Sequence, residues 1–235
     1  MREPIGEETL RRVAEMDRVT AWIAELVLAE AGRRVIEVGA GMGTFTTRLL
    51  PRERLVAVEP NLDHSSRLRE LERKHPCLSV VEADFTHDDC RALSAERCDT
   101  IVCLNVLEHI ADDARALANM YHLLAPGGRA LLLVPALRRL FGTLDTFLYH
   151  HRRYEMSELA EKVSAAGFVV KKLAYFNLFG MVGWWWNARV RRVEILPAGQ
   201  LALYNRLAPV FRRIEAWTGP PIGQSLWAVA EKPER

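Results

Sequence analysis

The sequence lacks the features that mark several large classes of protein. Its 32 basic and 30 acidic residues almost cancel, which leaves a net charge of +2 and no basic field for nucleic acid. No stretch approaches the roughly 20 apolar residues that span a bilayer, and the charged first residues lack the apolar core of a signal peptide. We therefore expect a cytoplasmic protein with no nucleic-acid partner.

Cysteine is also scarce. The chain has four cysteines, and no two of them form a C-x-x-C pair. Scattered cysteines in a chain of this size predict neither a disulfide framework nor a zinc site. We expect reduced thiols and no bound metal ion.

The length and composition fit an α/β fold. With 235 residues, 49% of them hydrophobic, the chain can bury a sizeable core. We expect residues 1–235 to form a single domain that begins with a helical segment over 1–30, its helical pattern starting near residue 7. Short apolar runs then alternate with helical patterns, which predicts a parallel sheet covered by helices on both faces. The expected strands are residues 35–38, 55–58, 78–81, 100–104, 129–134, 168–175 and 225–231.

One segment, residues 176–222, breaks this alternation. It contains the consecutive residues Trp184, Trp185 and Trp186, and three neighbours in sequence cannot share one face of a helix or strand. We expect an aromatic-rich insertion before the last strand. It acts as a lid over an apolar acceptor, as a contact with a membrane surface, or as a packing element or homodimer surface.

A glycine-rich turn follows the first expected strand in "VIEVGAGMGTFT", residues 35–46. A strand that runs through such a turn into a helix is typical of a nucleotide site. The dinucleotide pattern G-x-G-x-x-G would need a glycine where the chain has Thr44. The turn therefore favours a nucleotide-like ligand other than a dinucleotide.

Acidic or amide side chains lie within or just after the first four expected strands. Glu37 lies inside the first strand, Glu59 ends the second, Asp84 follows the third and Asn105 the fourth, and no lysine or arginine lies at these four ends. A pyrophosphate favours backbone N–H groups and basic side chains, whereas these ends suit a nucleoside with cationic groups, such as S-adenosylmethionine. In that interpretation Glu59 accepts both ribose hydroxyls, and Asp84 accepts the adenine amine.

Five motifs resemble, in order and spacing, those of the class I S-adenosylmethionine-dependent methyltransferases: "VIEVGAGMGTFT", "VAVEP", "EADF", "CDTIVCLNVLEHI" and "LLAPGGRALLLVPA". The resemblance covers residues 33–175 and resumes at the last strand. It implies a Rossmann-like, doubly wound sheet of seven strands in the order 3-2-1-4-5-7-6, with an antiparallel last strand and S-adenosylmethionine as the cofactor. The cofactor-binding residues expected on this basis are Glu37, Gly39, Ala40, Gly41, Gly43, Thr44, Glu59, Pro60, Asn61, Ala83, Asp84, Phe85, Asn105 and Val106.

The stretch "FGTLDTFLYHHRRYEMSEL" follows the fifth expected strand and opens onto the same edge of the sheet. It resembles the "GHYRRY" segment of a subset of small-molecule methyltransferases, although Tyr149 replaces its glycine and His151 its tyrosine. We expect His150 to be the catalytic base. The arginines either hold an anionic group of the acceptor or pair with Glu155 and Glu158, and His109 either touches a ligand or is a structural histidine. The expected acceptor-binding residues are His109, Tyr149, Arg152, Arg153, Tyr154 and Trp184.

The sequence therefore predicts methyl transfer to the oxygen or nitrogen of a small molecule with an apolar or aromatic part. A nicotinamide-dependent oxidoreductase is a rival interpretation, against which Thr44 and Asp84 argue. A cofactor-binding subunit without catalytic activity is another.

Overall fold

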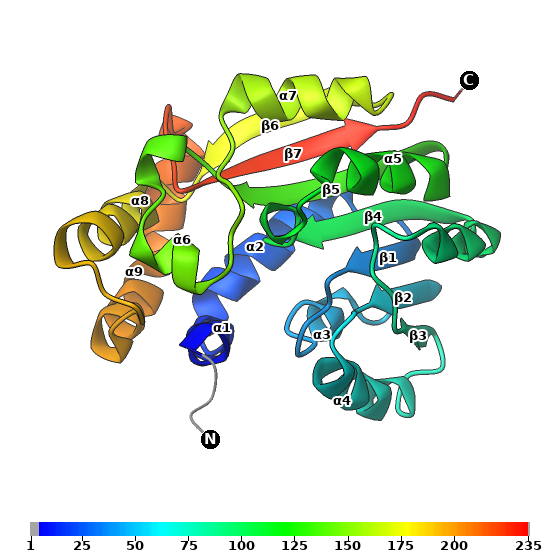
Figure 1. Ribbon diagram of the computed structural model, residues 1–235, viewed down its shortest axis with the longest axis horizontal. Helices are drawn as coiled ribbons and strands as arrows, with labels where there is room; N and C mark the ends of the chain where they lie inside the picture. The colour runs from blue at the N-terminus through cyan, green and yellow to red at the C-terminus, as the bar shows by residue number, and fades with distance from the viewer. Residues whose placement is uncertain (1–4, 235) are drawn as a thin grey trace.

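A computed structural model describes residues 5–234 of the chain, so residues 1–4 of the expected N-terminal segment lie outside it. Its centre is a seven-stranded sheet with the strand order β3-β2-β1-β4-β5-β7-β6 (Figure 1). Strands β1 to β5 run parallel, and β7 runs antiparallel to both β5 and β6. The predicted order and the antiparallel last strand are confirmed. The strands are β1 (Arg34–Val38), β2 (Arg54–Val58), β3 (Leu78–Val81), β4 (Cys98–Leu104), β5 (Leu124–Pro135), β6 (Val169–Phe176) and β7 (Ser225–Glu231).

Helices connect the strands and precede the first one. The α-helices are α1 (Ile5–Ala14), α2 (Asp17–Glu30), α3 (Thr46–Leu49), α4 (Leu62–Glu72), α5 (Asp113–Leu123), α6 (Thr143–Phe147), α7 (Met156–Ala165), α8 (Leu178–Trp185) and α9 (Ala198–Thr218). The other helical segments are the 3₁₀-helical η1 (Asp88–Glu96), η2 (Leu107–His109) and η3 (Arg138–Leu140) and the π-helical η4 (Trp186–Arg191).

The helical segment expected near the N-terminus contains two helices, α1 and α2. The chain leaves helical geometry at Met16, whose ψ is 67°, and this residue is buried in the core beneath α2. The break turns α1 away from the line of α2 and brings Val13 and Met16 to one cavity.

Two hydrophobic cores lie on opposite faces of the sheet, because successive strand residues point to opposite sides. Val35 and Leu55 belong to the core that α2, α4 and α9 cover, whereas Ile36 and Val56 belong to the core that α5 and α7 cover. The sheet is thus buried on both faces, as the uninterrupted apolar strands predicted.

The insertion over 176–222 folds into α8, η4 and α9. Polar contacts hold α9 against α2. Arg212 pairs with Glu25, and the Asn205 side chain accepts the backbone N–H of Arg18 at 2.9 Å. The three tryptophans separate as expected, since Trp184 is buried while Trp185 and Trp186 are 45% and 49% exposed.

The carboxyl ends of β1, β2 and β4, together with the amino end of β7, meet at one edge of the sheet. Ligands of open α/β sheets bind at this edge, and α1, α2, α8 and α9 lie beside it (Figure 1). Among residues 5–234, no helix combines the length and apolar character that crossing a bilayer requires.

Candidate cofactor and acceptor site

The turn after β1 is held close to the loop after β4. Gly39 adopts a φ of +67°, and its N–H donates to the carbonyl of Val58 at 2.8 Å. A Cβ at Gly39 would lie 2.5 Å from Cγ2 of Val106. Because a side chain there would be both strained and obstructed, only glycine lets the two loops approach.

Glu59 joins the same turn to the end of β2. Its Oε2 accepts the Gly41 N–H at 2.7 Å, and its Oε1 accepts the Asn61 N–H at 3.0 Å. The residue is only 6% exposed, so the carboxylate is fixed in place. Each oxygen retains acceptor capacity, which suits a pair of ribose hydroxyls. A Cβ at Gly41 would meet nothing within 4 Å, so the turn leaves space for a ligand beside this carboxylate.

Glu37 gives the site a second buried carboxyl group. Its Oε2 accepts the hydroxyl of Thr46 at 2.6 Å. Burial raises the pKa of Glu37 to about 8, and the negative charge of Glu59 adds to this effect. A cationic group that approached Glu37 would favour the ionised form of this carboxyl and would be stabilised by it.

The loop after β3 places its two expected cofactor residues differently. Asp84 is exposed, and its Oδ1 accepts both the N–H and the hydroxyl of Thr86, which lowers the pKa of Asp84. Phe85 is 4% exposed and packs in the core beside α5. The side chain of Phe85 thus belongs to the core, and its expected place in the cofactor site stays a prediction.

The other expected cofactor residues follow β1 to β4. Asn61 caps α4 by accepting the N–H groups of Asp63 and His64, so its side chain is engaged in the helix. Asn105 has a φ of +52°, and its N–H donates to the carbonyl of Leu133 at 2.7 Å. The remaining members of the set lie on the same loops: Ala40, Gly43, Thr44, Pro60, Ala83 and Val106.

A cavity of about 220 Å³ lies next to Asn105. Its walls are mostly apolar, and they come from the first two helices, the ends of β5 and β6, and the insertion. The polar groups Glu108, His109, His150 and Arg153 converge on it. The apolar lining residues include Val13, Met16, Val19, Ile23, Leu133, Pro135, Leu148, Phe176, Trp184, Leu196 and Leu201.

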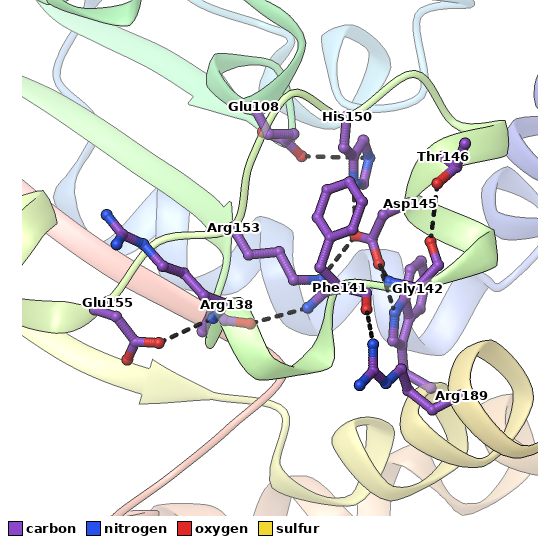
Figure 2. Close-up of polar contacts among 12 residues, drawn as sticks. Glu108, Arg138, Phe141, Gly142, Asp145, Thr146, His150, Arg153, Glu155 and Arg189 are labelled. Atoms are coloured by element: carbon purple, nitrogen blue, oxygen red, sulfur yellow. Dashed lines mark hydrogen bonds and ion pairs between the residues drawn. The ribbon is translucent and has the colours of Figure 1, made fainter.

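The loop after β5 supplies His150 and Arg153 to the polar wall, and the Asp145 carboxylate of this loop binds both. The loop leaves β5 at Pro135 and returns to it where the Tyr154 N–H donates to the Pro135 carbonyl at 2.9 Å. Figure 2 shows Asp145 on α6 with Gly142, His150 and Arg153 directed toward it. Four groups reach its two oxygens: Nδ1 of His150 at 2.9 Å, Nε of Arg153 at 2.7 Å, the Gly142 N–H at 3.0 Å and Nε1 of Trp184 at 3.3 Å.

These contacts set the proton positions on His150. Burial works to raise the pKa of Asp145, but the hydrogen bond from His150 and the charge of Arg153 outweigh it and hold that pKa below its usual range. An ionised carboxylate only accepts hydrogen bonds, so Nδ1 of His150 carries its hydrogen. In the neutral form of the ring the lone pair is then on Nε2, which lies 4.0 Å from Oε1 of Glu108.

Glu108 is the least satisfied polar group of the cavity wall. It is 1% exposed, and neither of its carboxylate oxygens has a hydrogen-bond partner among the described residues. Burial raises the pKa of Glu108 to about 7, against the opposing charges of His150 and Arg153. Glu108, His109 and His150 place one ligand atom each within 4.8 Å of one another, so they are also the residues that would face a cation in this cavity.

The structure brings only part of the expected acceptor set to the cavity. His109, His150, Arg153 and Trp184 line it, whereas Tyr149, Arg152 and Tyr154 do not. Tyr149 is 73% exposed, and its expected contact with the acceptor stays a prediction.

Arg152 and Tyr154 are engaged elsewhere. Both contact the carboxylate of Asp113, Arg152 at 2.7 Å and the Tyr154 hydroxyl at 2.9 Å. That these two residues touch the acceptor stays a prediction. Neither arginine makes the expected pairs with Glu155 and Glu158; Arg153 pairs with Asp145 instead.

Two residues of the polar wall were missing from the expected set. Asp145 lies five positions before His150 in the stretch that held the candidate base, and Glu108 directly precedes His109. Proximity in sequence was the available signal for each. Their roles depend on burial, which the local sequence does not reveal.

Several known proteins are similar in sequence to this chain. A family model described as a methyltransferase domain matches residues 10–173. A ubiquinone biosynthesis O-methyltransferase of Azotobacter vinelandii is 33% identical over 111 residues, or 46% of each chain. One of Xylella fastidiosa is 32% identical over 121 residues, which are 50% of this chain and 46% of the relative. The match thus spans about half the length of these curated relatives.

Solved structures share the fold. A methyltransferase of Haloferax volcanii in complex with the Trm112 methyltransferase activator has a TM-score of 0.65 at 19% identity and covers 100% of this chain and 98% of that one. A methyltransferase of Mesorhizobium loti, described as S-adenosylmethionine dependent, has a TM-score of 0.60 at 15% identity. The match covers 92% of this chain and 100% of that one. At these identities the likeness concerns the fold alone.

The raised pKa of Glu108 predicts a pH-dependent gain of stability in Glu108→Gln. Between about pH 4.5 and 7 the unfolded carboxyl ionises while the folded one keeps its proton, so the wild-type protein loses up to about 3 kcal/mol of stability that the variant keeps. Urea unfolding of both proteins at pH 4, 5.5 and 7.5 measures the difference.

Glu82→Gln is the matched control. Glu82 is exposed and its pKa is lowered by Arg69, so this variant gains no stability as the pH rises. A free-energy difference between wild type and Glu108→Gln that stayed constant over the whole range would contradict the raised pKa.

Proposed function

Because the chain belongs to the methyltransferase domain family, whose model matches residues 10–173, we propose that it transfers a methyl group from S-adenosylmethionine to a hydroxyl of a small apolar or aromatic acceptor. The observation that carries this proposal is the position of His150. It lies in the wall of an apolar cavity beside the cofactor edge, and the buried carboxylate of Asp145 fixes the ring hydrogen of His150 on Nδ1.

The residues at the cofactor edge fit S-adenosylmethionine. Glu59 would hold the ribose, and the open space beside Gly41 would admit the methionine portion. Glu37 would meet the positive charge of the cofactor, which suits a carboxyl that lacks a cation of its own. When bound, the cofactor supplies the methyl group on a positively charged sulfur that leaves as a neutral sulfide. The family assignment argues against the nicotinamide-dependent alternative.

The size and lining of the cavity support an aromatic acceptor. A dry apolar cavity of about 150 Å³ accepts a benzene ring, so a cavity of about 220 Å³ has room for one ring with small substituents. The relatives named as O-methyltransferases of ubiquinone biosynthesis support oxygen as the methylated atom. N-methylation remains the alternative, for which no base is needed.

His150 would take the proton of the acceptor hydroxyl at Nε2. The resulting imidazolium would lie against the ionised carboxylate of Asp145, which stabilises the positive charge as it forms. Arg153 and Trp184 hold that carboxylate in place from the other side. The remaining work of the site is to orient the acceptor and exclude water, since a good leaving group needs little further help.

Glu108 would recognise a second donor on the acceptor. A buried carboxyl group without partners is costly, and a hydroxyl beside the methylated oxygen would satisfy it. Since Glu108 and Nε2 of His150 are 4.0 Å apart, vicinal hydroxyl groups on one ring match their spacing. The cytoplasmic location, the single domain and a homodimer all stay predictions.

Removal of the Glu59 carboxylate is expected to weaken cofactor binding. Glu59→Ala deletes charge-assisted hydrogen bonds of about 1.5–3 kcal/mol, which corresponds to roughly a tenfold to hundredfold loss of affinity for S-adenosylhomocysteine. Isothermal calorimetry measures it, with Glu70→Ala on the exposed face of α4 as the charge-matched control. Unchanged affinity in a folded Glu59→Ala protein would remove Glu59 from the cofactor site.

The proposed base predicts a separation of turnover from cofactor binding. His150→Ala and Asp145→Asn are expected to lower the single-turnover rate with catechol-type acceptors by about 10²–10⁴, because one variant lacks the base and the other no longer fixes its hydrogen. Affinity for S-adenosylhomocysteine stays near wild type in both.

His122→Ala, on the exposed end of α5, is the control and keeps the wild-type rate. A wild-type rate in His150→Ala would remove His150 from catalysis. Loss of cofactor binding together with turnover would instead indicate that the loop had misfolded.

A further inference from the structure

Helix α9 carries an exposed apolar stripe with a strict spacing. Five large apolar residues lie four, three, four and three positions apart, which places them in one row along the helix. All of them are exposed, with exposed fractions from 37% to 88%. The residues are Leu203, Leu207, Val210, Ile214 and Trp217.

The opposite face of α9 is fixed in the protein, so this stripe cannot turn inward. The Phe211 ring stacks on Phe179 with centroids 4.3 Å apart. The Glu215 carboxylate accepts the N–H groups of Asn177 and Leu178, at 2.9 and 2.8 Å, and so holds the start of α8. Because these contacts hold the opposite face of α9 against the protein, the stripe faces solvent.

The charge beside the stripe has one sign. Arg206 and Arg213 each directly precede a stripe residue, both are exposed, and neither has an acidic partner among the residues that the structure describes. Residues 178–218 contain six arginines and two glutamates. One of the glutamates, Glu215, is buried.

The same composition continues on the neighbouring helices. Trp185 and Trp186 are about half exposed, and Val182 and Val190 are exposed to a similar extent. The basic residues there are Arg189, Arg191 and Arg192, all exposed. Tryptophan and arginine beside exposed aliphatic side chains are typical of segments that lie in a membrane interface.

A second copy of the chain fits this stripe poorly. Antiparallel pairing about Val210 would set Arg206 of one copy against Arg213 of the other, at positions where opposite charges normally lie. Parallel pairing would need Tyr204 and Phe211 at the contact between the two helices, but both rings already pack within the protein itself. An identical chain therefore does not offer α9 a surface that matches both the apolar stripe and its arginines.

We propose that the outer face of α9 lies on the surface of an anionic lipid bilayer. The five stripe residues rest at the boundary of headgroups and acyl chains, and Arg206 and Arg213 reach back to lipid phosphates along their apolar stems. The inference is independent of methyl transfer. It also bears on the acceptor, since Leu201 and Tyr204 of the same helix line the cavity, so an apolar acceptor would have a short route from the bilayer.

Co-sedimentation of the full chain with vesicles tests this contact. We expect binding to vesicles of phosphatidylglycerol and phosphatidylcholine, and much weaker binding to phosphatidylcholine alone. An arginine near an anionic surface contributes about fivefold in binding, so the double variant Arg206→Gln, Arg213→Gln binds about 25-fold more weakly. Leu207→Ser with Val210→Ser is expected to lose binding as well.

The control is Arg73→Gln with Lys74→Gln. It removes the same two charges from the exposed end of α4, beside β3 at the other side of the sheet, and is expected to bind within twofold of wild type. The proposal would be overturned if the control lost as much vesicle binding as Arg206→Gln with Arg213→Gln. It would also be overturned if the wild-type protein did not bind anionic vesicles. A dimer in sedimentation velocity that Leu207→Ser with Val210→Ser dissociates would overturn it too, since the stripe would then be a dimer surface.

Discussion

The buried carboxylate of Asp145 is the contact on which the polar wall of the site depends. It receives hydrogen bonds from His150, Arg153, Trp184 and the backbone of Gly142, so it ties the loop after β5 to α8. Arg153 lies 4.8 Å from the centroid of the Trp184 ring and also donates to the carbonyl of Ala136. Without this carboxylate, Arg153 would be a buried charge without compensation, and His150 would have no fixed hydrogen. The geometry of the proposed base is thus a consequence of how the insertion packs on the sheet edge.

Buried acidic groups unite the cofactor edge and the acceptor cavity. Glu37 and Glu108 both have raised pKa values because each is buried, and at Glu108 the charges of His150 and Arg153 only partly oppose this effect. Such groups cost stability in the absence of ligands, and binding of a cationic cofactor and a hydroxylated acceptor would offset that cost. This distribution of charge differs from that of a phosphate site, where basic side chains and free N–H groups prevail.

The sequence predicted the parts of the structure that depend on local patterns. Strand β7 over Ser225–Glu231 has the expected bounds, and the turn around Gly39 has the expected form, since apolar runs and glycine turns are encoded locally. The break at Met16, the burial of Phe85 and Tyr154 and the exposure of Tyr149 were not predictable in this way. Each depends on which distant element packs against the residue. The cavity is the clearest case, because its walls come from helices at both ends of the chain.

The most direct test of the central claim is a thermal unfolding measurement with two ligands. A ligand present at 100 times its dissociation constant stabilises the folded protein by about 2.7 kcal/mol. We predict that S-adenosylhomocysteine raises the melting temperature of the protein and that a nicotinamide dinucleotide leaves it unchanged. Stabilisation by the nicotinamide dinucleotide alone would contradict the account.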